Sequence, residues 1–459
     1  MKKTLLVLLA LIFTAGSAMA GNVDTYGIGA RAQSLGGAYA ATADDPYAAY
    51  YNPAGLTQIK GLTMSAGVVM ADPSLQAKGY RVKYDNTSAP GIQDMGPTDI
   101  QDKTDILMIP SMGGAMPLTD NIVVGMAVYA PFGLQIEWEE NAFDNPGAFD
   151  TYYSGIMREV VTPTIAFKLN DMFSFGAGIS LGKSKSFQKM QNYGLSVGVG
   201  GGELGLGPYE NPVLINVELE DDFNWSFNLG VMCNVSDDFT LGLTYRGRTS
   251  VKQTGTMSFG GPGAALLNLA GVAPDISMDD VDFPEQVQIG ARFKPKGNLS
   301  LEADLVWTNW SVVESQTLII DSPPSIMVPG LVNGNALINA RNWVNTVQVK
   351  CGAEWQVNDM LALRVGYYFD PSPIPDATFD IPWPDADKNN FSIGFGLNFL
   401  EHWTLDTVLQ YTYTIRDRNI GGESEVLNHV YAYPGYHGEA EATASGSIWI
   451  GGFTVSCTF

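Results

Sequence analysis

A repeated unit dominates this chain from about residue 105 to its C-terminus: two runs of alternating apolar and polar or small residues, joined by a tight polar turn. The clearest case covers residues 391–413, where large apolar side chains at alternate positions flank the turn Glu401-His402. Period-two alternation indicates β-strands with one apolar and one polar face. The chain is too long for a two-layer sandwich of such units, and its last residue is Phe459. The pattern predicts an antiparallel transmembrane β-barrel, apolar outside and polar inside.

Short polar turns set the expected number of strands. Six of them are typical Asn, Asp or Gly turn signals, around residues 119–121, 170–171, 236–238, 295–297, 358–359 and 401–402. Six hairpins give twelve strands, and a first strand near 61–71 and a last near 446–459 bring the total to fourteen. An even number places both ends on the periplasmic side. Long outer loops are then expected at 72–104, 131–158, 186–222, 251–284, 313–342, 371–388 and 416–445.

The alternation also assigns charged side chains to the barrel interior. Mixed charges would be costly in a dry core, whereas in a lumen they can pair or hydrate. The predicted interior set is Arg246, Arg292, Glu302, Asp304, Lys350, Glu354, Arg364 and Asp406. The three cysteines fall on the apolar, lipid-facing side of their strands, and their number and spacing exclude a disulfide framework or zinc site as the organising principle; they are Cys233, Cys351 and Cys457.

The N-terminus predicts export. Residues 1–20 have a positive end, a short apolar run and a small-residue cleavage site at Ala18-Met19-Ala20, the pattern of a signal peptide. The formal net charge of −23 argues against a nucleic-acid partner, whose phosphates need a basic surface.

Residues 21–60 break the strand pattern and are rich in Ala, Gly and Tyr. Asp45 can cap a short helix with Pro46 at its first position, and Asn52-Pro53 can end it. Wall side chains cannot fill the lumen of a fourteen-stranded barrel. We therefore predict that 21–60 form a small hatch with short helices that plugs the barrel of residues 61–459; a periplasmic extension is the alternative.

Several segments resemble one family. The sequences at 27–32, 36–38, 43–45, 52–56, 130–134 and 170–178 are similar to those of the FadL/TodX family of outer-membrane transporters, which carry long-chain fatty acids and aromatic hydrocarbons. This resemblance covers essentially the whole mature chain. It implies a hatch carrying Asn52-Pro53-Ala54, capture of an apolar ligand by outer loops, and lateral release through a kink in the third strand. We place the kink at Gly125, with a break in wall pairing over 123–127, because glycine inside a strand permits a bulge. Asn52 can hydrogen-bond the backbone that the kinked third strand leaves unpaired.

Candidate ligand contacts follow from the loops and the lumen. Leu266, Leu267 and Leu269 form a short apolar segment in one outer loop, and Leu204 and Leu206 offer an opposing wall in another. An outer loop has little reason to carry such residues without a partner, although packing on the rim is the alternative.

The interior cations Arg246 and Arg364 can contact a carboxylate head group. Pairing with neighbouring acids is the alternative for each of them.

The sequence therefore predicts a passive outer-membrane transporter of hydrophobic small molecules, without choosing between fatty acid and hydrocarbon. Alternatives are a non-transporting surface protein, such as an adhesin or phage receptor, and a general diffusion porin, which the hatch would block. No enzyme, cofactor or metal is expected, because no G-x-S-x-G elbow and no clustered metal-ligand pattern occur. Expected partners are outer-membrane lipid, lipopolysaccharide and the barrel assembly machinery, which would recognise Phe459; we expect a monomer.

Overall fold

The computed structural model describes residues 22–24, 26–85, 94–142, 144–192, 196–199, 202–205, 213–265, 274–279, 281–320, 326–327, 335–382, 384–415, 417–431 and 437–459. The expected signal peptide, residues 1–20, lies outside them.

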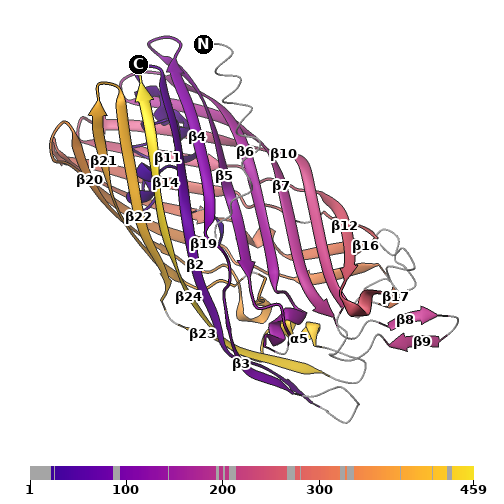
Figure 1. The fold of residues 1–459 in the computed structure, drawn as a ribbon. Coiled ribbons are helices and arrows are strands. Elements are labelled where there is room, and N and C mark those ends of the chain that lie inside the picture. The colour runs from indigo at the N-terminus through magenta and orange to yellow at the C-terminus, as the bar shows by residue number, and fades with distance from the viewer. Residues whose placement is uncertain are drawn as a thin grey trace.

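Fourteen antiparallel strands form a closed barrel, as predicted (Figure 1). Each strand pairs with the next, and the ring closes where the first strand pairs with the last, from Thr63↔Thr458 to Tyr84↔Gly438. Closure removes the exposed edges that an open sheet would have. The wall strands are β2 (Thr63–Tyr84), β4 (Leu107–Pro117), β5 (Ile122–Glu137), β6 (Tyr153–Lys168), β7 (Phe173–Asn192), β10 (Val213–Ser236), β11 (Phe239–Arg246), β14 (Gln286–Lys296), β15 (Leu299–Thr308), β19 (Thr346–Gln356), β20 (Leu361–Asp370), β21 (Lys388–Leu400), β22 (Trp403–Thr414) and β24 (Gly438–Thr458).

The remaining elements are short. The helices are α2 (Ala30–Ser34), α3 (Ala48–Tyr51), α5 (Glu425–Val430), and the 3₁₀ turns η1 (Pro53–Gln58), η2 (Pro146–Phe149), η3 (Pro262–Ala264), η4 (Trp310–Val312) and η5 (Asp376–Thr378). The short strands are β1 (Asn22–Asp24), β3 (Met95–Gln101), β8 (Ser196–Val199), β9 (Gly202–Gly205), β12 (Gln253–Gly260), β13 (Asp275–Met278), β16 (Ser315–Ile320), β17 (Ile326–Met327), β18 (Ala336–Ala340) and β23 (Arg418–Gly421). No helix of the described residues is long and apolar enough to cross a membrane.

The six predicted turns lie between wall strands at one end of the barrel, and the long connections lie at the other end (Figure 1). Several predicted strand bounds are wrong, because strands continue far into the expected loops. The first strand, expected near 61–71, runs on to Tyr84, and the last begins at Gly438 rather than near 446. Beyond the bilayer both faces of a strand meet water or loops, so the apolar alternation that marks a membrane strand fades there.

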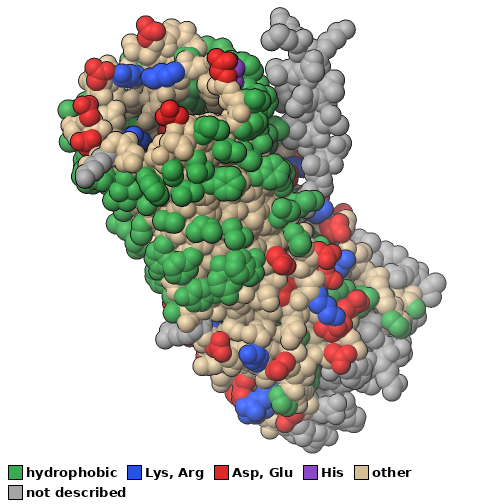
Figure 2. Space-filling model, turned by 60° about the vertical axis from the view of Figure 1, so that its left-hand side comes forward, with side chains coloured by type: hydrophobic (Ala, Val, Ile, Leu, Met, Phe, Trp, Pro, Cys, Tyr) green, Lys and Arg blue, Asp and Glu red, His purple; other side chains and the backbone are tan. Residues whose placement is uncertain are grey.

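On the face shown in Figure 2, an apolar band crosses the middle of the barrel, with charged side chains gathered at its two ends. Exposed side chains at alternate positions form this band, for example Val347, Val349 and Trp355 on β19. Among the cysteines, Cys351 is exposed on the same face. Cys457 has the predicted outward register but is buried, because it pairs between Met64 and Trp403 on the flanking strands.

The hatch lies inside the barrel. Its short helices α2, α3 and η1 are almost completely buried. Together with inward residues of β4, β5 and β6 they form one apolar cluster, centred on the tyrosines Tyr39, Tyr47 and Tyr51. The lumen is therefore a packed interior at this level.

Wall glycines allow the hatch backbone to approach the barrel closely. A Cβ atom at Gly366 would lie 2.0 Å from the backbone nitrogen of Gly36, and one at Gly230 would lie 2.2 Å from Oδ1 of Asn52. Such distances are far below van der Waals contact, so any side chain would displace the hatch. The same holds, with separations up to 3.0 Å, around most of the barrel. The hatch-facing wall glycines are Gly113, Gly125, Gly176, Gly230, Gly242, Gly290, Gly352, Gly366 and Gly394, each on a different strand.

We predict that Gly366→Val displaces the hatch while the barrel still closes, because the wall ladders do not involve its side chain. Single-channel conductance in planar bilayers should then rise above that of the unmodified protein. Gly451→Val on β24 is the matched control, since a Cβ atom there meets nothing within 4 Å. A folded, heat-modifiable Gly366→Val barrel with unchanged conductance would contradict the prediction.

Candidate functional site

The third wall strand, β5, is interrupted in the middle. Its ladder with β6 runs from Ile122↔Phe167 to Tyr129↔Val160, shifts register, and resumes at Phe132↔Arg158. Its ladder with β4 covers only Pro117↔Val123 to Met112↔Val128. Pro131 lies within the interruption, and proline lacks the N–H that a ladder needs. The wall pairing between β4 and β5 therefore stops beyond Val128.

Our expectation of a break at 123–127, with Gly125 as its cause, is wrong. Both ladders of β5 are regular over these residues. Gly125 faces the hatch instead, and a Cβ atom there would lie 3.0 Å from Cδ1 of Leu56. This glycine makes room for a side chain of the hatch. The break lies at Pro131, six positions further along the chain.

The first strand of the hatch, β1, lies at this break. Strand β1 pairs with β5 at Asn22↔Gly133 and Asp24↔Phe132. Strand β1 thus pairs with the part of β5 that lies beyond the end of the described β4 ladder. The break and the start of the hatch are therefore in direct contact.

Asn52 fixes the turn that precedes η1. Its Nδ2 donates to the carbonyl oxygens of Ala40 at 2.7 Å and Val231 at 3.1 Å, and its Oδ1 accepts from the N–H of Ala54 at 3.1 Å. The expectation that Asn52 bonds the kinked third strand is wrong, because its wall partner is on β10. Pro53 lies against Gly176 and Gly230, which allow this contact.

A small cavity lies beside the break. Tyr50 of the hatch, Tyr129, Pro131 and Phe132 of the β5 region, and the side chains of Arg158 and Arg246 line it. Both arginines come from wall strands and are buried, with Arg158 only 2% exposed. The interruption in the wall and two buried cations therefore share one cavity.

Both guanidinium groups donate their hydrogen bonds to neutral groups. Arg158 donates from Nε to Oδ1 of Asn224 at 2.7 Å. Arg246 donates to side-chain oxygens of Gln286 at 2.9 Å and Gln288 at 3.0 Å, and its guanidinium lies 4.5 Å from the ring centre of Tyr50. Neither arginine forms an ion pair with an acid among the described residues. Buried charges normally have a counter-charge, so this cavity favours an anion.

Arg364, the other predicted head-group contact, has acidic partners. It pairs with Glu354 and Asp406, both at 2.6 Å. Glu354 in turn pairs with Arg31 of the hatch at 3.2 Å. Arg364 therefore belongs to a network that joins the hatch to the wall, the alternative raised from the sequence. Arg158 was missed because it is the last residue of the expected loop 131–158.

The outer loops form a common apolar cap over the barrel. Buried side chains from six of the seven long connections make one cluster; it includes Tyr80, Trp138, Phe149, Val251, Phe283, Trp310, Trp343, Phe379, Ile381, Leu427 and Tyr431. The predicted ligand contacts Leu206, Leu266, Leu267 and Leu269 lie outside the described residues. The backbone of Leu204 lies in β9, but its side chain is not described.

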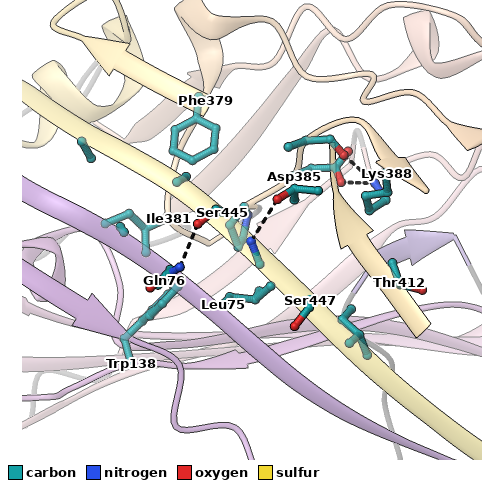
Figure 3. A pocket seen from close by; sticks show the side chains of 18 of the residues that line it. Leu75, Gln76, Trp138, Phe379, Ile381, Asp385, Lys388, Thr412, Ser445 and Ser447 are labelled. Carbon is teal, nitrogen blue, oxygen red and sulfur yellow. Dashed lines mark hydrogen bonds and ion pairs between the residues drawn. The ribbon is translucent and has the colours of Figure 1, made fainter. Parts of the chain in front are cut away.

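An apolar chamber lies under this cap (Figure 3). Trp138, Phe379 and Ile381 of the cap and Leu75 of β2 contribute apolar side chains to it. Lys388 lies at one side, paired with Asp385 and, at 3.5 Å, with Asp370. The chamber is thus an apolar space with a neutralised charge pair at its edge, suited to a hydrocarbon chain.

Three loops of the cap meet at a buried charge cluster. Arg341 and Asp380 form a buried ion pair. Asp150 follows η2, and its Oδ2 accepts from the N–H of Ile381 at 3.3 Å. Burial, reinforced by the carboxylate of Asp380, raises the pKa of Asp150 to about 8.

We predict that this carboxyl makes the cap pH-dependent. The buried site favours the neutral form of the Asp150 carboxyl. The contribution of this group to the stability of the cap is therefore complete below the unfolded-state pKa of about 4. It is lost as the pH rises through about 8. Asp150→Asn should keep the hydrogen-exchange protection of the cap constant between these pH values. In the unmodified protein this protection should fall at least about tenfold, the equivalent of one pKa unit. Asp144→Asn, an exposed carboxylate of the same loop, is the control and should behave like the unmodified protein. Equal pH profiles for Asp150→Asn and the unmodified protein would contradict this.

Within the described part of the chain, no group of three or more His, Cys, Asp or Glu residues could hold a metal ion. The geometry defines a class: an outer-membrane barrel whose lumen is closed by its own N-terminal hatch, with an apolar chamber on the loop side and an interrupted wall strand. A profile of the outer membrane protein transport protein (OMPP1/FadL/TodX) family matches residues 6–459, and the chain belongs to this family.

Individual relatives agree with this assignment. A putative outer membrane protein of Neisseria meningitidis is 28% identical over 426 residues, which cover 88% of each chain. The long-chain fatty acid transport protein of Escherichia coli is 22% identical over 493 residues, covering 100% of this chain and 98% of that protein. The crystal structure of a Pseudomonas aeruginosa FadL homologue has the same fold, with a TM-score of 0.76 at 20% identity, covering 97% of this chain and 100% of that one. The chain is therefore an outer-membrane transport protein of this family.

Proposed function

We propose that this protein transports long-chain monocarboxylates, fatty acids or close analogues, and releases them sideways into the bilayer through the break between β4 and β5. One observation carries the proposal: two buried arginines without acidic partners lie in the cavity beside the break. A carboxylate accepts charge-assisted hydrogen bonds from guanidinium groups and would supply the missing counter-charge. An aromatic hydrocarbon or an alkane would leave both charges uncompensated.

The chamber and the arginine cavity suit the two parts of such a molecule. Trp138 lines the chamber, Phe132 lines the cavity, and both belong to the same apolar cap cluster. Transit from chamber to cavity would rearrange this cluster. Each methylene that then enters the bilayer contributes about 0.8 kcal/mol, so sideways release is favoured over travel through the charged lumen.

The packed hatch weighs against a general diffusion porin, which needs an aqueous lumen. The non-transporting surface protein would have no use for a cavity with unpaired buried cations. The family match favours transport over both alternatives.

We predict that Arg158→Leu lowers uptake of a long-chain fatty acid at limiting concentration by about tenfold to a hundredfold, because hydrogen bonds to charged groups contribute about 1.5–3 kcal/mol. The measurement is initial uptake by cells that lack other transporters of this family, at matched surface levels. Arg248→Leu is the control, since that guanidinium is half exposed and already paired with Asp282.

An alkane of the same chain length serves as the control substrate, and its uptake should not fall in Arg158→Leu. Equal losses for acid and alkane would contradict the carboxylate assignment. An unchanged uptake of the acid would contradict it as well.

We also predict that Pro131→Val slows release. Valine restores the backbone N–H donor to β5 and adds bulk beside the cavity, so the wall can pair across the break. Uptake should fall about tenfold, a change equivalent to roughly 1.4 kcal/mol. Pro163→Val is the matched control, because Pro163 faces outward from β6 opposite Met126, where the ladder is regular. Normal uptake in Pro131→Val would count against lateral release at this position.

A further inference from the structure

The wall of the chamber is thin at one place, far from the break in β5 along the chain. Ser445, Gly446 and Ser447 of β24, with Leu75 and Gln76 of β2, line the chamber. The same five residues also line a second hollow, which is polar. Residues 443–447 are all half-buried, whereas buried positions alternate with exposed or half-buried ones on both sides, at 438–442 and 448–450. One short stretch of small residues is therefore shared by two spaces.

The strand ladder has a gap at this stretch. Pairing of β22 with β24 ends at Tyr413↔Ser447, and β23 takes over only at Arg418↔Ala444. The described ladders thus skip Ser445 and Gly446 on that side. The N–H of Gly446 donates to the side chain of Thr414 at 3.3 Å. On its other side β24 remains paired with β2.

Two light contacts cover the gap from the β2 side. A Cβ atom at Gly446 would lie 2.2 Å from Cδ2 of Leu75, so the leucine side chain rests directly on this glycine. Gln76 donates from Nε2 to Oγ of Ser445 at 3.0 Å, as the dashed line in Figure 3 shows. The β2–β24 ladder is continuous here, so the opening lies on the β22 side, where no described ladder pair involves Ser445 or Gly446.

Aromatic residues mark the depth of the gap. Tyr411 and Tyr413 line the polar hollow, and the ring centre of Tyr411 lies 4.5 Å from that of Trp449, which is half exposed. Such outward aromatics are typical of the level where acyl chains meet head groups. Ser445 and Gly446 follow Trp449 toward the loop end, so the gap opens at the head-group level. Amphipathic molecules concentrate at that level.

We propose that this stretch is a portal through which the amphipathic substrate enters the chamber from the outer membrane interface. The proposal rests on the proposed function for the identity of the substrate. It separates admission, at β24 beside β22 and β2, from release, at β5 beside β4. The side chain of Leu75 blocks this portal and is called its plug. The hydrogen bond between Gln76 and Ser445 holds the portal closed.

The test uses purified barrels in phospholipid vesicles that contain a diazirine-bearing long-chain fatty acid. Photolysis followed by peptide mass spectrometry measures adducts on the chamber residue Phe379. Ser445→Trp should lower this labelling by at least about fivefold, as expected when a gate is held closed. Thr443→Trp is the matched control: it lies two residues away on the same face of β24 and lines neither the chamber nor the hollow. Equal labelling in Ser445→Trp and Thr443→Trp would overturn the proposal.

A second pair of variants keeps the test decisive if Ser445→Trp folds poorly. Leu75→Ala removes the plug and should speed labelling of Phe379. Ile381→Ala enlarges the chamber by a similar amount without touching the hollow, and should not speed it. Equal rates for Leu75→Ala and Ile381→Ala would also overturn the portal.

The two proposals fail in different ways. If cells show no fatty acid uptake but labelling still depends on Ser445 and Leu75, the proposed function fails and the portal stands. If uptake depends on Arg158 and labelling is the same in every portal variant, the portal fails and the proposed function stands.

Discussion

The interior of this barrel depends on close contact between the hatch backbone and glycines of the wall strands. Nine of the fourteen wall strands place a glycine against the hatch, and at Gly176, Gly242, Gly352 and Gly366 hatch backbone lies where a Cβ atom would be. Carboxylates of the wall then reach hatch N–H groups directly: Asp304 accepts from Tyr39 and Ala40, both at 3.0 Å. Without this approach the hatch amides would be buried without partners, which is costly.

The buried charges divide into two sets with different consequences. Arg31, Glu354, Arg364 and Asp406 pair with each other and hold the hatch to the wall. Arg158 and Arg246 are held by amide oxygens, an environment that positions a cation without cancelling its charge. Removing one member of the first set would leave a buried charge unpaired, whereas the second set is already in that condition.

Sequence alone predicted the fourteen strands, the turns and the inward direction of the lumen charges, because each follows from period-two alternation. It did not predict where β5 is interrupted. Pro131 was read as part of an outer loop, and Gly125 offered a plausible bulge, yet glycine in this wall serves close packing. Arg158 was hidden for the same reason, since strand β6 begins earlier than the alternation shows. Whether Arg246 or Arg364 has an acidic partner depends on contacts across strands, which no local pattern contains.

The close fit of the hatch also has a consequence for how the molecule is assembled. The hatch precedes β2 in the chain and is joined to it by only a few residues, while the ring closes between β2 and β24, the last strand to be made. Glycines on many strands hold the hatch closely. Inserting the hatch into a barrel that has already closed is therefore harder than wrapping an open sheet around it. The hatch is therefore the body around which the final strand pairing is completed. The first effect of a faulty hatch would be slow closure of the barrel.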